Sequence, residues 1–240
     1  TKVFDLGMEE FVALDGVSLD LAENEFVTVV GPSGCGKSTM LNILAGLLEP
    51  TSGEAIVNGK VVDGPSPERG VIFQQYALFP WLTVRDNVEF GLKTAKVSPR
   101  ERRERAQHFI DMVGLTQFAD ALPKTLSGGM KQRCAIARAY AMNPSILLMD
   151  EPFGALDALT RQKMNFELVN IWQRSGKTVV LITHSIQEAL ILADRVVVMS
   201  ERPGRLVEEL EIDLPRPRMA AAVGRGSQTY LGLVRQIEQA

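Results

Sequence analysis

The sequence has few cysteines, no excess of positive charge and no long apolar run, and each absence excludes a class of protein. The two cysteines among 240 residues, Cys35 and Cys134, lie far apart without metal-ligand spacing, which favours a reducing compartment over a disulfide framework. The net charge of −3 argues against a nucleic-acid sheath, so we expect no nucleic-acid partner. No apolar run is long enough to cross a bilayer and the first residues show no leader pattern, so we expect any membrane crossing to belong to another chain.

The composition is that of a globular protein, and the pattern of apolar runs predicts its class. Strand-like runs alternate with helical patterns, which favours an α/β domain with a largely parallel core sheet. The predicted strands are Phe26–Val30, 71–73, 146–149, Thr178–Ile182 and Arg195–Met199. Residues 12–21 and 54–62 do not follow this alternation of strands and helices. Asn58 followed by Gly59 is a strong hairpin signal, so we expect an antiparallel β lobe beside the core.

The strand alternation stops in the middle of the chain. Ser98 and Pro99 predict a capped helix start, followed by a charged run that we interpret as a solvated helical face. Residues 131–142 are also helical, and Pro144 ends that pattern. We expect a single domain over residues 1–240, which divides into a core with a β lobe (about 1–74 and 141–200), an inserted helical subdomain (about 75–140) and a hairpin-and-helix extension (about 201–240).

A phosphate-binding loop follows the first core strand. It consists of Gly31, Pro32, Ser33, Gly34, Cys35, Gly36, Lys37, Ser38 and Thr39. The glycines let backbone N–H groups converge on phosphate oxygens, and the following helix, expected over 39–48, adds an N-terminus that favours anions. Lys37 is expected to reach the β- and γ-phosphates and the Ser38 hydroxyl to bind Mg²⁺. The alternative is a chance glycine-rich turn, which the strand-loop-helix order argues against.

A second acidic element comes at Asp150 and Glu151, after the apolar run 146–149. A strand that ends in a carboxylate places Asp150 at the carboxyl edge of the sheet, where we expect it to bind Mg²⁺ directly or through water. Glu151 points differently and is the candidate to polarise a water in line with the γ-phosphate. The alternative, a solvated strand end, is less attractive beside a phosphate loop.

Four further segments match one family in the correct order. Residues 126–133, Leu-Ser-Gly-Gly-Met-Lys-Gln-Arg, resemble the signature motif of ABC-type ATPases. The other matches are Phe73, Gln74 and Gln75 for the Q-loop, residues 154–157 for the D-loop, and Thr183 with His184 for the switch histidine. The resemblance covers essentially the whole chain and implies a P-loop NTPase core of ABC ATPase type, with an antiparallel β subdomain and an inserted helical subdomain.

The resemblance implies ATP and Mg²⁺ as ligands and a second copy of the chain as partner. Ser127, Gly128 and Gly129 offer a hydroxyl and backbone N–H groups at a helix start, which is a second anion site. In the family this signature covers the γ-phosphate bound by the other copy, in a head-to-tail dimer. ATP then acts as a ligand of the closed dimer. The structural interpretation, a helix cap, is compatible with this role.

The family also gives roles to three other side chains. Gln74 is expected to touch Mg²⁺ or water and to link the nucleotide to the membrane partner; Gln75 is the competing residue. His184 is expected to hold the γ-phosphate and the attacking water, although a histidine after a strand is often structural. Asp157 is expected to act across the dimer, and within one chain it is a good helix N-cap.

This sequence departs from the family pattern at two places. Met130 stands where many members have glutamine, as it does in the nitrate, sulfonate and taurine importer branch. The aromatic ring expected to stack on adenine is Phe4, because base stacking needs an exposed ring, while Phe11 is the alternative.

The expected function of the chain follows from what it lacks and from three further segments that resemble one importer group. Exporters usually carry fused membrane spans and soluble ABC factors usually carry two ATPase domains, so an importer subunit is favoured. Residues 79–84, 201–206 and 214–218 resemble the nitrate, sulfonate and taurine importers. The implied partners are membrane permease subunits and, indirectly, a periplasmic or extracellular solute-binding protein, with the chain at the cytoplasmic membrane face. Trp81 would either pack in a core or contact the permease. The alternative function is a stand-alone ABC-type ATPase in nucleic-acid repair or translation.

Overall fold

The computed structural model describes residues 1–5, 7, 9–216, 218 and 228–239, which form two compact units. The first unit comprises Thr1–Ser66 and Thr178–Ala240, and the second comprises Pro67–Lys177. Both combine strands with helices, as the predicted α/β class requires. The finer subdomain limits given above remain predictions.

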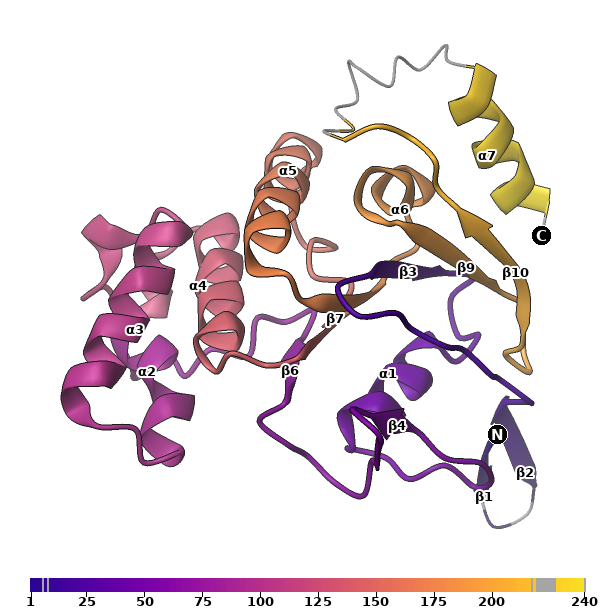
Figure 1. Ribbon diagram of the computed structural model, residues 1–240, viewed down its shortest axis with the longest axis horizontal. Coiled ribbons are helices and arrows are strands. Elements are labelled where there is room, and N and C mark those ends of the chain that lie inside the picture. The colour runs from indigo at the N-terminus through magenta and orange to yellow at the C-terminus, as the bar shows by residue number, and fades with distance from the viewer. Residues whose placement is uncertain (6, 8, 217, 219–227, 240) are drawn as a thin grey trace. The chain divides into compact units, whose positions relative to one another are not determined.

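The first unit is built on strands that were predicted at their correct limits. Strand β3 (Phe26–Val30) lies between β8 (Thr178–Ile182) and β9 (Arg195–Met199) and is parallel to both (Figure 1). All five residues of β3 are buried, which is why this strand reads as a continuous apolar run and not as an alternating one. Strand β10 (Leu206–Glu211) pairs antiparallel with β9, so the expected hairpin has only one of its strands in the 201–240 extension.

Two hairpins complete the β structure of this unit. Strands β1 (Lys2–Asp5) and β2 (Glu10–Leu14) pair antiparallel, as do β4 (Ile56–Val57) and β5 (Lys60–Val61). The predicted turn at Asn58 and Gly59 is confirmed, because both residues have positive φ, 52° and 71°. The prediction of a strand-like segment over 12–21 is wrong beyond Leu14, because the Asp15 N–H donates to the Gly204 carbonyl instead of extending the hairpin ladder.

Within the described residues, the first unit contains three helices. Helix α1 (Lys37–Ala45) begins two residues earlier than predicted and ends three earlier, because Gly46 with φ 76° forms a left-handed C-cap. Helix α6 (Ile186–Leu192) follows β8, and α7 (Gln228–Gln239), predicted at the same limits, packs against α6.

Two arginines close the C-terminal end of α6. The buried Arg218 guanidinium donates to the carbonyls of Leu190 and Ala193, and Arg216 donates to the carbonyl of Leu192. The last carbonyls of a helix have no partner within the helix, so these donors replace the missing ones. Burial lowers the pKa of Arg218 to about 10, which still leaves the side chain charged at neutral pH.

The second unit combines two parallel strands with a group of helices. Strand β6 (Arg69–Ile72) pairs with β7 (Ile146–Asp150), so β6 lies two residues earlier than predicted at its start. Helices α2 (Val84–Thr94), α3 (Pro99–Met112) and α4 (Gly128–Ala141) pack on one another (Figure 1). The unit also contains α5 (Ala158–Ser175) and two 3₁₀ turns, η1 (Thr116–Phe118) and η2 (Pro123–Thr125).

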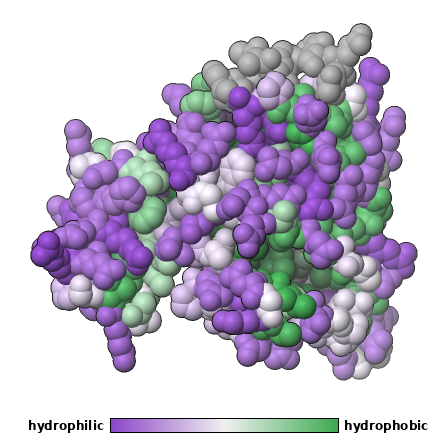
Figure 2. Space-filling view, in the orientation of Figure 1, coloured by the Kyte–Doolittle hydropathy of each residue, from purple (hydrophilic) through white to green (hydrophobic). Residues whose placement is uncertain are grey.

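Helix starts in this unit follow the predicted capping chemistry. Ser98 accepts a hydrogen bond from Glu101 N–H and Pro99 occupies the first turn of α3, as expected. Helix α4 begins at Gly128, three residues before the predicted 131, because the Ser127 side chain caps it. Most of the charged run of α3 is exposed, and hydrophilic residues dominate the visible surface of this helical group (Figure 2). Arg102 and Arg105 are only partly exposed, and Arg102 pairs with Glu89 at 2.7 Å. Among the residues that the structure describes, no helix combines the length and apolarity that a membrane span requires.

Candidate nucleotide site

The phosphate loop ends in a helix N-terminus that no side chain caps. Helix α1 follows Gly36, which has φ 101°, makes no side-chain cap and is followed by no acidic residue in the first turn. Helices α2 to α6 each have a capping side chain that accepts a backbone hydrogen bond. These caps are Thr83, Ser98, Ser127, Asp157 and Ser185. The start of α1 therefore keeps its positive end without an acidic side chain, which fits a bound phosphate.

The loop glycines are required because the backbone around them leaves no room for side chains. A Cβ at Gly31 would lie 2.9 Å from the Met199 carbonyl oxygen, and one at Gly36 would lie 2.7 Å from the Ala13 carbonyl oxygen. Gly36 also has a left-handed φ that other residues rarely adopt. The loop is thus held closely between β2 and the end of β9, which fixes the direction of its N–H groups.

Lys37 lies over the inner side of this loop. Its side chain is buried, and Nζ donates to the carbonyls of Gly31 and Pro32 at 2.8 and 2.7 Å. The Cys35 thiol is also buried, 3.6 Å from the same Nζ, so it has no access to solvent and serves as packing. The ammonium group is thus within the curve of the loop, where an anion would be bound, and the residues present fit a phosphate chain.

His184 lies in the same unit, in the segment between β8 and α6. The preceding Thr183 donates its N–H to the Val29 carbonyl at 3.2 Å, two residues before the phosphate loop begins. Thr183 Oγ1 also bonds the buried Glu188 carboxylate and accepts from Ser185 N–H at 3.1 Å. His184 itself is exposed. Its backbone position is therefore set by the neighbouring strand and by the first turn of α6.

Both candidate adenine-stacking rings lie on one face of the first hairpin. Phe4 and Phe11 are cross-strand partners, and their ring centroids are 6.3 Å apart. Lys2 Nζ lies 5.1 Å from the Phe4 centroid, and the Arg202 guanidinium lies 4.4 Å from the Phe11 centroid. The two rings are only partly buried, so both remain candidates for base stacking.

In the second unit the Q-loop and the acidic pair come together. Asp150 is the last residue of β7, and Gln74 Nε2 lies 3.5 Å from Glu151 Oε2. Glu151 has φ 42°, a left-handed conformation that is unusual for a residue with a side chain. Such a conformation turns Glu151 away from the direction that a continued strand would give it, and its role in polarising a water stays a prediction.

The signature segment and the D-loop also lie in contact in this unit. Ser127 is exposed and accepts from Met130 N–H at 3.3 Å. A Cβ at Gly128 would lie 3.1 Å from the Tyr76 hydroxyl and 3.3 Å from Leu156. Burial raises the pKa of Tyr76, so this hydroxyl stays protonated at neutral pH.

Asp157 caps helix α5 in addition to its predicted role in the D-loop. Its carboxylate accepts from Thr160 N–H at 3.0 Å. A hydrogen bond from the Thr160 side chain, followed by the backbone N–H of the same residue, lowers the pKa of Asp157. The carboxylate is therefore ionised at neutral pH, both as a cap and as a group that a partner could contact.

The predicted Mg²⁺ ligands are oxygen donors, which is the chemistry that this ion prefers. Ser38 belongs to the first unit, and Gln74 and Asp150 belong to the second. Among the residues described, no three His, Cys, Asp or Glu side chains gather in a way that would hold a metal ion by themselves. Each of these side chains has the oxygen chemistry that suits Mg²⁺, and their joint use for one ion stays a prediction.

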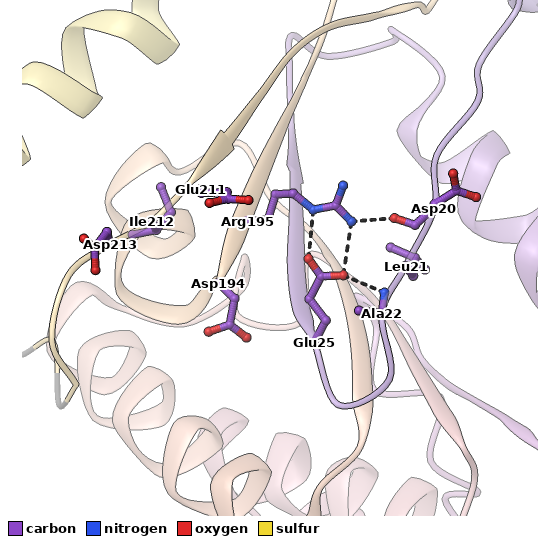
Figure 3. Close-up of a pocket in the computed structure, with 9 residues that line it drawn as sticks. All are labelled: Asp20, Leu21, Ala22, Glu25, Asp194, Arg195, Glu211, Ile212 and Asp213. Atoms are coloured by element: carbon purple, nitrogen blue, oxygen red, sulfur yellow. Dashed lines mark hydrogen bonds and ion pairs between the residues drawn. The ribbon is translucent and has the colours of Figure 1, made fainter.

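A separate cavity of about 760 Å³ lies in the first unit and contains none of the predicted site residues. Figure 3 shows the Arg195 guanidinium between Glu25 and the Asp20 carbonyl. Arg195 also pairs with Glu209 at 2.6 Å. Four further acidic side chains line the cavity, so it would repel a nucleotide. They are Asp20, Asp194, Glu211 and Asp213.

The structure therefore groups most predicted site residues within their own unit. The phosphate loop, His184 and the Phe4–Phe11 pair belong to the first, while Gln74, the acidic pair, the signature and Asp157 belong to the second. Sequence reasoning missed two side chains beside these motifs, Arg202 and Tyr76. The signal for the first was present, because the Arg-Pro-Gly turn after a core strand is part of a segment that resembles importers, but the sequence gives Arg202 no contact.

Comparison with known proteins identifies the family. The model of the ABC transporter family matches residues 14–154. The chain is 66% identical over 211 residues to a Brucella abortus protein named for ATP binding, with 88% of this chain and 81% of that protein covered. It is 53% identical to a nitrate import ATP-binding protein of Synechocystis (85% and 77% covered) and 54% identical to a taurine import ATP-binding protein of Rhizobium johnstonii (85% and 78% covered).

A solved structure supports the same assignment. The dimeric structure of a bacterial ABC transporter cassette superimposes with a TM-score of 0.78 at 39% identity, covering 89% of this chain and 97% of that one. The fold, the ordered motifs and these similarities agree. The chain belongs to the ABC transporter family and is an ATP-hydrolysing subunit of the ABC type.

Proposed function

We propose that this chain powers an importer for nitrate, a sulfonate, taurine or a similar small solute. Two copies close head-to-tail around ATP, and the closure drives a separate membrane permease. The similarity to nitrate and taurine import proteins supports the solute class. It does not favour the alternative role in nucleic-acid repair or translation. The chain would work at the cytoplasmic face of the membrane, supplied indirectly by a solute-binding protein.

The proposed roles of the chain's own residues follow from their chemistry. Lys37 and the N–H groups of the phosphate loop bind the phosphates, and Phe4 carries the adenine. Ser38, Gln74 and Asp150 would hold Mg²⁺, which supplies positive charge for the phosphate oxygens. Glu151 would orient and deprotonate the water.

Further residues would sense the phosphate and join the two copies. His184 would bond the terminal phosphate from the segment that Thr183 fixes against Val29. Asp157 would contribute from the second copy. The rigid backbone around His184 supports this role, since a sensing group has to keep its position when the phosphate leaves.

The exposed start of α4 is the main observation that supports the proposed dimer. Ser127 is accessible at the surface although it belongs to a motif with anion-binding chemistry, and Gly128 and Gly129 leave the first-turn N–H groups uncovered by side chains of their own. One chain already has a phosphate loop for its own nucleotide. A second, exposed anion site on the same chain is explained most simply by a nucleotide that another copy presents.

An exposed aromatic group supports a contact with the permease. Trp81 is 71% exposed, which excludes the core-packing interpretation of this residue. Its ring lies 5.7 Å from Phe79, which lies 4.3 Å from the ring of Phe90, itself 43% exposed. Exposed aromatic residues of this kind are typical anchors in protein interfaces. We therefore assign the permease contact to Trp81, Phe79 and Phe90.

The decisive measurement is the nucleotide dependence of association for Glu151→Gln. This variant keeps the shape of the side chain but lacks the carboxylate, so bound ATP should persist and hold two copies together. Light scattering after size exclusion should show a dimer with ATP and Mg²⁺ and a monomer with ADP. A variant that stays monomeric with ATP at every protein concentration would exclude the composite site.

A matched variant tests the signature directly. Ser127→Arg in the Glu151→Gln background places a large side chain at an exposed position. It should bind a fluorescent ATP analogue as well as its parent does. It should nevertheless remain monomeric, because the arginine side chain would obstruct contact with the nucleotide of the partner copy. Dimerisation at the parental level would show that the α4 start takes no part in closure.

A further inference from the structure

The turn formed by residues 200–205 has a fixed shape. The Ser200 N–H donates to the Arg205 carbonyl and the Arg205 N–H donates to Ser200 Oγ, each at 3.0 Å. The Ser200 hydroxyl lies 2.7 Å from the carbonyl oxygen of Glu201 and 3.0 Å from that of Pro203. Local bonds of this kind hold a short loop in one conformation, so its side chains leave in set directions.

The turn is also fastened to strand β2 and lies against the phosphate loop. The Gly204 N–H donates to the Ala13 carbonyl at 3.1 Å, and the Asp15 N–H donates to the Gly204 carbonyl at 2.9 Å. Arg205 pairs with Asp15, with Nε 3.0 Å from Oδ2. A Cβ at Gly204 would overlap the Cys35 carbonyl oxygen, so the turn backbone contacts the loop directly.

From this turn the Arg202 side chain extends between an aromatic ring and the phosphate loop. Its guanidinium carbon lies 4.4 Å from the Phe11 ring centroid, a cation–π distance. On its other side, Nη2 would lie 3.2 Å from a Cβ placed on Gly34. In the part of the chain that the structure describes, no carboxylate pairs with this guanidinium. A fixed positive group therefore stands beside the loop without an acidic partner.

We propose that Arg202 is a nucleotide-binding residue that donates hydrogen bonds to the phosphate chain in the loop while its guanidinium remains stacked on Phe11. The planar fork of arginine matches phosphate oxygens in pairs. The ring beneath it limits the rotation of the side chain, which reduces the entropy lost on binding. Lys37 approaches from inside the loop, whereas Arg202 approaches at Gly34, so the two cations would share the phosphates. The inference rests on the proposed use of this loop for ATP.

The test is nucleotide binding by the full-length chain, without turnover. A fluorescent ADP analogue is titrated into wild type, Arg202→Ala and Arg202→Lys, and inorganic tripolyphosphate is then used as competitor. Loss of a charge-assisted pair should raise the dissociation constants of both ligands about tenfold in Arg202→Ala. The dissociation constants of Arg202→Lys should lie between those of wild type and Arg202→Ala, because lysine keeps the charge but lacks the planar fork of the guanidinium.

The charge-matched control is Arg103→Ala, since it removes the same charge from an exposed side chain of helix α3 that takes part in neither the turn nor the phosphate loop. Its dissociation constants should match wild type, which excludes a general effect of net charge. Equal affinities in Arg202→Ala and wild type would overturn the proposal, and so would a loss confined to the nucleotide with tripolyphosphate unchanged. Failure of wild type itself to bind the analogue would instead overturn the proposed function. Thermal unfolding identifies any variant that fails to fold, in which case Arg202→Lys provides the comparison.

Discussion

The two helix starts that the sequence marks as anion sites, α1 in the first unit and α4 in the second, are built in opposite ways. The start of α1 has no capping side chain, and its glycines are closely packed against neighbouring backbone. The start of α4 is capped by Ser127 and has no residue with positive φ. The first is completed by a ligand, whereas the second is complete without one. This contrast fits a loop that binds the chain's own nucleotide and, under the proposed function, a surface that meets a nucleotide only when two copies close.

The largest expected difference between the two starts concerns the glycines. Gly36→Ala would place a Cβ 2.7 Å from the Ala13 carbonyl at φ 101°, so we expect a loss of about 3 kcal/mol in unfolding free energy, with loss of ATP binding. In Gly129→Ala the new Cβ would meet only a methyl group of Thr160, at 3.1 Å, and we expect a change below about 1 kcal/mol. Urea denaturation of both variants makes the comparison, and equal losses would remove the contrast.

A smaller effect is expected at the cap of α4. Ser127→Ala removes the side chain that accepts from Met130 N–H and should cost about 1 kcal/mol of stability. Affinity of the monomer for a fluorescent ATP analogue should be unchanged, because the ligand-dependent start is that of α1. Ser127→Asp retains a cap and is the stability control, so a stable Ser127→Ala would show that the cap contributes little.

The smallest effect concerns the pH dependence of the cap on α5. Because hydrogen bonds from Thr160 lower the pKa of Asp157, ionised Asp157 stabilises the fold above its unfolded-state pKa. That contribution is lost as pH falls through the lower, folded-state value, in a window below about pH 4. Asp157→Asn keeps a capping side chain but cannot titrate, so its stability should fall less steeply with acid in chemical denaturation at stepped pH. Parallel curves for both proteins would show that Asp157 does not contribute.

The sequence predicted the parts of the fold that local patterns determine. Strands β3, β8 and β9 and helix α7 lie at the expected limits, because buried apolar runs and one amphipathic stripe define them. The predicted helix starts were less accurate where glycine or a cap extends the helix before its first apolar residue, as at α1 and α4. Strand β2 ended early because its edge bonds to Gly204, a partner 190 residues later that no local pattern reveals.

The site shows the same limit. Motif spacing named Lys37, Glu151 and His184, but their chemistry depends on neighbours that arrive from elsewhere in the chain. The position of Arg202 beside Gly34 and Phe11 requires the turn after β9, the loop after β3 and the first hairpin to meet. Such a meeting is a property of the tertiary fold, so composition and periodicity cannot indicate it. The exposure of Trp81 is likewise decided by packing and not by residue type.

The arginines that close helix α6 have a consequence for the shortest chain that can keep His184 in place. The last recognised motif ends at His184, yet the helix after it is held at its far end by Arg216 and Arg218. A chain cut before these residues would leave the final carbonyls of α6 without donors in a buried position, although every motif would still be present. Truncations, fusions and affinity tags are therefore best placed after helix α7, which packs against α6 and buries Ile237, because this folding unit extends well beyond the end of its motifs.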